Sequence, residues 1–233
     1  MSTYRKKHIY RIRFSRTGKI RFLSHLEQIE AIRRAIRRAE LPVNYSSGFH
    51  PQMEISFGPA ISVGYESLCE FADIELEKFI EPIEIFKSIE KSLPHGFSVL
   101  EVKKIPGFLP SIDSVVNLAE YSIENIEKFF SEEQVKKIIE DTLSKNEILF
   151  EFFKKNKSEK LDLRKLIYKL EYSNGILSLF LRFRPGKNIK PEIVIGHIFN
   201  LDENSVKYLK VCRKMLYFEK PDGTLTSFWV RNL

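Results

Sequence analysis

The sequence predicts an α+β fold built from two tandem ferredoxin-like (split βαβ) domains, each an antiparallel sheet with helices on one face. Two observations predict this fold. Segments with strand and helix periodicity follow in the order strand, helix, two strands, helix, strand, and this order nearly repeats in the second half. A segment with two prolines and a glycine, residues 105–110, lies between the halves. We therefore expect domains at 1–106 and 107–233, the second with an extra strand.

The first predicted element is a half-buried strand at residues 9–14, because apolar and polar residues alternate there. Tyr10, Ile12 and Phe14 fall on one face and should pack on the helices. Arg11 and Arg13 fall on the other face, which we expect to be open.

A basic amphipathic helix is predicted at Ser24–Ala39. Ser24 and Glu27 have the spacing of a capping box, which marks the start of a helix. The apolar residues recur at helical spacing and predict a buried stripe; they are Leu26, Ile29, Ile32 and Ile36.

The rest of the first half reads as an extended segment, a strand pair, a helix and a last strand. Residues 43–76 carry several Gly and Pro turn signals and end in a strand at Phe71–Leu76. An amphipathic helix follows at Pro82–Leu93, and Phe97–Lys103 alternates as a strand.

The second half has its clearest signal at Asn174–Gly175, which predicts a two-residue type I′ hairpin between strands 166–172 and 176–183. The other expected elements are strands at 118–124, 148–153 and 206–218 and helices at 132–144 and 191–199.

Positive charge is concentrated at one end of the chain. The first 50 residues hold 12 Lys and Arg against 3 Asp and Glu, a net of +9, whereas the whole chain of 233 residues carries +7. A one-sided basic surface indicates a polyanionic partner, most often nucleic acid. The alternative is a solvated or protein-facing surface.

The candidate phosphate-binding residues are arginines of the first strand and helix, joined by a smaller basic loop in the second half. They are Arg11, Arg13, Arg21, Arg33, Arg34, Arg37, Arg38, Arg182, Arg184 and Lys187. No aromatic residues are expected on the open sheet face, so we expect contact with the phosphate backbone and not base stacking.

Two histidines are candidates for catalysis. His25, at the first helical position, could act as general acid and base in metal-independent RNA cleavage, or could simply cap or fix the neighbouring loop. His50 lies in the turn Gly48, Phe49, His50, Pro51, whose glycine and proline predict a shaped, exposed substrate loop. Both histidines could converge on one site if the turn folds over the start of the helix.

The sequence contains no recognisable motif for metal binding, cofactor binding or nucleophilic catalysis. The two cysteines stand far apart, and no nucleotide-binding loop, metal-ligand spacing or Ser-His-Asp order is present, so we expect no metal and no cofactor. No run of 18 uncharged apolar residues occurs. We expect a soluble cytoplasmic protein without a membrane partner; its oligomeric state stays open.

Residues 10–75 resemble a bacterial family of unknown function, described as radical SAM-linked and named DUF2344. The resemblance rests on FSRTGKIRFLSHLE, YSSGFHPQMEISFGPAISVGYES and FADIEL. Ser62 stands where the family often has proline, and Gln52 where histidine is common. The resemblance implies a B12-binding-type radical SAM partner and an RNA or ribosome setting. Because the chain lacks a three-cysteine cluster motif, it would be the companion of that enzyme.

These observations favour a non-catalytic RNA-binding accessory module that acts with a radical SAM enzyme. An endoribonuclease using His25 or His50 is the second hypothesis. A protein-protein adaptor for the radical SAM partner is the third.

Overall fold

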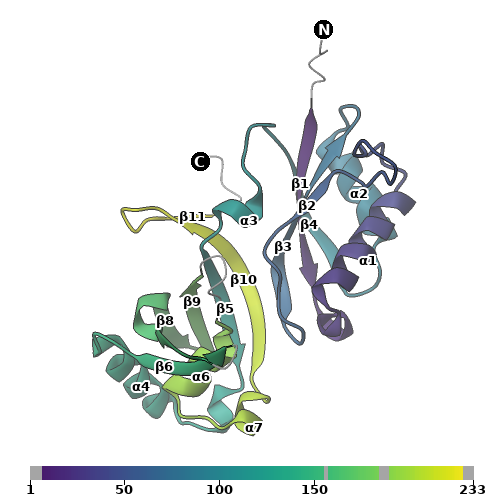
Figure 1. Cartoon of the computed structure of the whole chain (residues 1–233). Helices are drawn as coiled ribbons and strands as arrows, with labels where there is room; N and C mark the ends of the chain where they lie inside the picture. Colours follow the sequence, from purple (N-terminus) through teal and green to yellow (C-terminus); the bar gives the residue numbers. More distant parts are fainter. Residues whose placement is uncertain (1–6, 155–156, 184–188, 228–233) are drawn as a thin grey trace. The chain divides into compact units, whose positions relative to one another are not determined.

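A computed structural model of the chain describes residues 7–154, 157–183 and 189–227. The fold is α+β, as predicted, and the chain divides into two compact units, residues 1–116 and 117–233 (Figure 1). The division into domains 1–106 and 107–233 stays a prediction, because compact packing does not test whether each part folds independently.

Four antiparallel strands form the sheet of the N-terminal unit. Strand β1 pairs with β4 on one edge and β3 on the other, and β2 pairs with the far edge of β3 at residues 72–74. The order across the sheet is therefore β4-β1-β3-β2. The strands are β1 (His8–Arg16), β2 (Ile55–Phe57), β3 (Glu66–Leu76) and β4 (Phe97–Ile105).

Two helices, α1 (His25–Arg38) and α2 (Pro82–Ser92), cover one face of this sheet. Tyr10, Ile12 and Phe14 are at most 2% exposed and belong to one hydrophobic core with residues of both helices, as predicted. The short helix η1 (Gly18–Phe22) links β1 to α1. The alternation of β1 thus determines which side of the strand enters the core.

The opposite sheet face is not open, contrary to the prediction. The segment predicted as a linker runs into the short helix α3 (Ile112–Val115) and packs on that face. A Cβ on Gly107 would lie 3.8 Å from Ile9 Cδ1, and a Cβ on Gly58 would lie 3.6 Å from Ile112 Cγ2. Ile112 itself is 1% exposed. Apolar residues of 107–116 therefore give this face a cover of its own.

The sheet of the C-terminal unit has the order β10-β5-β9-β8, again with antiparallel neighbours, and β11 pairs with β10. Its strands are β5 (Leu118–Glu124), β8 (Ile167–Ser173), β9 (Ile176–Arg182), β10 (Lys210–Glu219) and β11 (Leu225–Ser227). Its helices are η2 (Ile126–Lys128), α4 (Glu132–Ser144), α5 (Leu163–Leu166), α6 (Pro191–Ile198) and α7 (Glu203–Val206).

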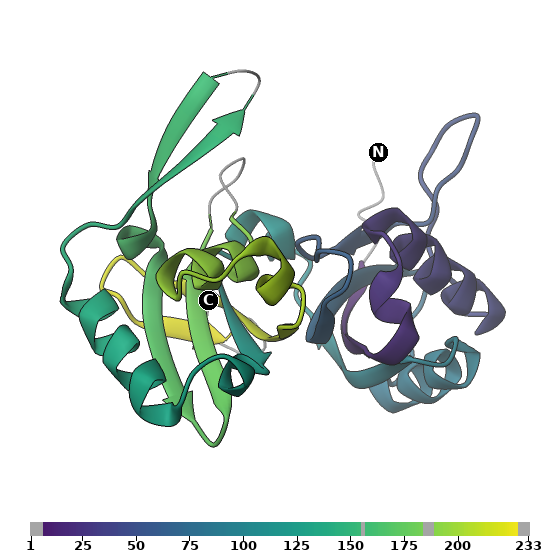
Figure 2. The same cartoon turned by 90° about the horizontal axis from the view of Figure 1, so that it is seen from below.

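The predicted hairpin at Asn174–Gly175 is confirmed. Asn174 has φ +52° and Gly175 has φ +78°, the left-handed pair that a type I′ turn requires. The strand predicted at 148–153 belongs instead to a separate hairpin of β6 (Leu149–Lys154) and β7 (Lys157–Asp162), which extends away from the sheet (Figure 2). The lysine-rich sequence of β7 has no apolar alternation, so periodicity could not reveal it.

Candidate nucleic-acid interface

Helix α1 starts where the sequence predicts. The Ser24 hydroxyl accepts a hydrogen bond from the Glu27 amide at 3.3 Å, and the Glu27 carboxylate accepts one from the Ser24 amide at 2.7 Å. These bonds lower the pKa of Glu27 below its usual range. The buried face carries Gln28, Ile32, Ala35 and Ile36. Leu26, predicted to be buried, is 74% exposed.

Three arginines of α1 present their guanidinium groups to solvent. Arg34, Arg37 and Arg38 are exposed. Arg34 Nε donates to the Glu30 carbonyl at 3.2 Å, and Arg38 Nη2 donates to the Ser92 carbonyl at 2.6 Å. In the part of the chain that the structure describes, none of the three forms an ion pair with a carboxylate. Their charge is therefore left for an external anion.

Arginines outside this group are partly neutralised by the chain's own acids. Arg33 lies 3.1 Å from Glu30, one helical turn away. Arg21 and Arg13 lie 3.6 Å from Glu66 and Glu101 respectively, and both side chains are about one third exposed or less. Such pairs hold their guanidinium groups loosely and can still contact a ligand.

Arg11 is not available to a phosphate. It is 3% exposed and forms a two-bonded ion pair with Asp73, its direct neighbour on β3. Arg11 Nε lies 2.8 Å from Oδ1 and Nη2 lies 2.7 Å from Oδ2. The covered sheet face explains the difference from the prediction, since a buried guanidinium needs a carboxylate partner.

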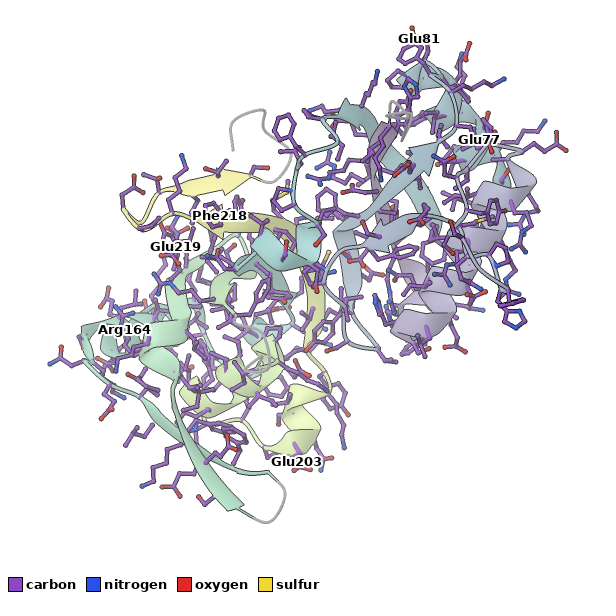
Figure 3. The ribbon with its side chains drawn as sticks, turned by 45° about the horizontal axis from the view of Figure 1, so that its top comes forward. Glu77, Glu81, Arg164, Glu203, Phe218 and Glu219 are labelled. Atoms are coloured by element: carbon purple, nitrogen blue, oxygen red, sulfur yellow. The ribbon has the colours of Figure 1, made fainter. Side chains whose placement is uncertain are left out.

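Arg182 is the candidate of the second basic loop that the structure describes, and it is paired with an acid of its own unit. Arg182 donates from Nε and Nη2 to the Glu219 carboxylate at 2.6 and 2.8 Å, and this pairing raises the pKa of Arg182 (Glu219 is labelled in Figure 3). Its guanidinium also stacks over Tyr168 at 5.0 Å. Arg184 and Lys187 lie outside the described residues.

Helix α2 adds lysines that the sequence analysis did not single out. Arg38, Ser88, Lys91 and Ser92 line a hollow of about 420 Å³ together with Ala39 and Glu40. Lys87 and Lys91 are exposed and lie one turn apart on α2. The hollow therefore extends the basic surface of α1 onto α2. Helix packing, and not sequence proximity, brings these residues together.

The two histidines do not converge. His25 begins α1, close to the end of β1, where Arg16 pairs with Ser67 of β3. His50 lies in the segment after Val43, which bridges to Leu76 at the other end of β3. Leu76 lies nine positions along the strand from Ser67, which is about 30 Å. RNA cleavage by either histidine alone stays a prediction.

The turn Gly48–Pro51 is exposed, as predicted for a presented loop. Gly48 has φ +129°, a conformation that favours glycine, and Phe49, His50 and Pro51 are all exposed. In the residues that the structure describes, no group of three or more His, Cys, Asp or Glu could hold a metal ion.

A buried polar network fixes the start of α1, and the sequence analysis did not single it out. Arg16 is 0% exposed. Its guanidinium donates to Gln28 Oε1 at 2.7 Å and to the carbonyls of Arg21 and Leu23 at 2.6 and 2.7 Å. Gln28 Nε2 in turn donates to Glu70 at 2.8 Å. The feature of the sequence that could have revealed this network is Gln28, a polar residue on the otherwise apolar face of α1.

The comparisons with known proteins identify the family of the chain. Residues 9–191 match the model of a family described as "Uncharacterized protein conserved in bacteria (DUF2344)". The chain belongs to the DUF2344 family. The match includes β1, η1, α1, the Gly48–Pro51 turn and most of the C-terminal unit. No curated protein matches the chain.

One further observation concerns membranes. Among the described residues of this DUF2344 chain, no helix has the length and apolar character needed to cross a bilayer.

Proposed function

We propose that this DUF2344 chain is an RNA-binding accessory module that contacts the phosphate backbone and acts with a B12-binding-type radical SAM enzyme. One observation carries the RNA-binding part: Arg34, Arg37 and Arg38 are exposed on one helix, and the hydrogen bonds of Arg34 and Arg38 go to backbone carbonyls and not to carboxylates. Exposed guanidinium groups that are not paired with a carboxylate favour phosphate, because a phosphate group accepts two parallel hydrogen bonds from the planar guanidinium.

The topology supports a more specific description of the fold. Each unit contains a strand, a helix, two strands, a helix and a strand in chain order, and in each sheet the last of these strands lies beside the first. This is the arrangement of the split βαβ fold. We propose that both units are ferredoxin-like, with the β6–β7 hairpin inserted in the second and β11 appended to it.

The test of RNA binding is charge reversal on α1. The triple variant R34E/R37E/R38E should lose binding to RNA in a low-salt filter assay. A matched control, K128E/K136E/K137E, makes the same change in net charge at exposed lysines of the C-terminal unit and should retain most of the affinity. Equal retention by both variants would refute the proposal.

Exposed apolar side chains support the link to a protein partner. Phe22, Leu26 and Val63 are 60%, 74% and 56% exposed. The Gly64 amide donates to the Arg21 carbonyl at 2.7 Å, so the turn with Val63 lies beside η1. Apolar residues gathered outside the core are typical of protein interfaces. We propose that they contact the radical SAM enzyme, at the opposite end of α1 from Arg37 and Arg38.

Co-purification of the two proteins after nuclease treatment tests this contact. The variant L26E should lose the radical SAM enzyme and keep RNA binding, whereas R34E/R37E/R38E should show the reverse. Loss of the enzyme from R34E/R37E/R38E, with L26E unaffected, would favour the alternative in which the basic face is a protein-protein adaptor.

A further inference from the structure

The segment between α1 and β2 forms a narrow arm with paired backbone. Tyr45 bridges to Met53, the Ser46 amide donates to the Gln52 carbonyl at 2.8 Å, and the Glu54 amide donates to the Asn44 carbonyl at 2.8 Å. The Gln52 amide also donates to the Ser46 hydroxyl at 3.0 Å. Figure 2 shows this segment extending away from the rest of the N-terminal unit. Hydrogen bonds therefore hold the two sides of the arm together as far as Ser46 and Gln52.

An aromatic ring stands at the tip of this arm without any cover. Phe49 is 102% exposed, more than any other large apolar residue of the part that the structure describes. Gly48, with φ +129°, and Pro51 shape the turn on either side of it. A phenylalanine in this position contributes nothing to the core, so packing does not account for it.

The arm begins shortly after the exposed arginines along the chain. Only five residues separate Arg38, at the end of α1, from Asn44, at the start of the arm. Val43 pairs with Leu76, which holds the base of the arm at the sheet edge. From Asn44 the chain can extend about 17 Å before it reaches Phe49.

The charges around the arm indicate where an anionic strand could run. Residues 44–53 contain no Asp or Glu. The nearest acids in sequence are Glu40 and Glu54, and at the base of the arm the Asn44 side-chain amide donates to the Glu75 carboxylate at 2.9 Å. An anion is therefore favoured at the tip and along the α1 face and disfavoured at the base.

We propose that Phe49 stacks on a base of single-stranded RNA whose phosphates lie against Arg34, Arg37 and Arg38. The inference rests on the proposed function and adds its substrate class: a strand with unpaired bases. Stacking on aromatic side chains and phosphate contact with basic side chains are the two components of single-strand binding. The sequence predicted no base stacking, because it placed Tyr10 and Phe14 against the helices, where they are indeed buried; the arm supplies an exposed ring that this prediction did not consider.

The test compares a single-stranded RNA of about 12 nucleotides, within the site sizes of single-strand-binding folds, with a ribose-phosphate strand of the same length that lacks bases. Phe49→Ala should lower the affinity for the base-containing strand about 10-fold and leave the affinity for the abasic strand unchanged. Phe49→Trp should retain the affinity, and its fluorescence should be quenched only by the strand that carries bases.

The matched control is Phe108→Ala, because Phe108 is also highly exposed, at 85%, but lies in the segment on the opposite side of the sheet from α1. It should bind both strands as the parent chain does. If Phe49→Ala affects both strands equally or neither, the stacking inference is wrong and RNA binding by the arginines stands. A parent chain that binds neither strand refutes the proposed function together with the inference.

Discussion

Arg16 on β1 donates a hydrogen bond of 2.7 Å to Gln28 on α1, and both side chains are buried. Gln28 in turn donates a hydrogen bond to Glu70 of β3. The side-chain amide of Gln28 therefore links a buried guanidinium group to a buried carboxylate. Because a buried charge is tolerated only with partners, these residues are expected to depend on one another.

Removing the arginine tests this dependence. Arg16→Ala should lower the free energy of unfolding by about 3 kcal/mol, since it leaves the Gln28 amide and two carbonyls without their donor. Urea unfolding followed by circular dichroism measures the loss. Arg37→Ala, at an exposed position of α1, should change the free energy by less than about 0.5 kcal/mol. Similar values for both variants would contradict the role assigned to the network.

The salt dependence of RNA binding should reveal how many phosphates α1 contacts. If Arg34, Arg37 and Arg38 each neutralise one phosphate of a single strand, the slope of log K against log salt should become shallower by about 0.7 for each Arg→Ala change. Titrations at several salt concentrations give the slopes. Arg11→Lys should leave the slope unchanged, because Arg11 is buried against Asp73.

Arg182 is expected to matter for stability and not for binding. Its two hydrogen bonds to Glu219 join the end of β9 to the end of β10. Arg182→Ala should lower the free energy of unfolding by about 1–2 kcal/mol, a moderate value because the pair is partly exposed. RNA affinity should stay within twofold or so of the parent chain, a comparison that the filter assay provides. A large loss of affinity would show that Arg182 takes part in RNA binding.

Local patterns in the sequence predicted most of the elements but not the environment of each charge. Alternation in β1 correctly placed Tyr10, Ile12 and Phe14 in the core, and the capping box correctly placed the start of α1. The same alternation put Arg11 on an open face. That face is covered by residues 107–116, whose position depends on tertiary packing about 100 residues further along the chain.

In the candidate site too, local patterns predict some features and tertiary packing determines others. Exposure of Arg34, Arg37 and Arg38 follows from helical periodicity, which the sequence contains. Lys91 and Arg38 line the same hollow because of how α1 crosses α2. The distance between His25 and His50 depends on strand register. No local pattern encodes either relationship.

Stability should also respond to pH through Glu192, in the first turn of α6. Burial raises the pKa of Glu192 to about 7. Lys190 Nζ lies 3.8 Å away but is largely exposed, so it does not offset the burial. Because the folded state holds this proton more tightly than the unfolded state, the carboxylate destabilises the fold as pH rises from about 4.5 to about 7, by up to about 3 kcal/mol.

Glu192→Gln removes this titration. The variant should be more stable than the parent chain at about pH 8, where the parent carboxyl has lost its proton, and should match it at about pH 4, where the carboxyl is protonated in both states. Urea unfolding at the two pH values gives the comparison. A variant that gains the same stability at both would show that the effect comes from packing of the amide and not from the buried charge.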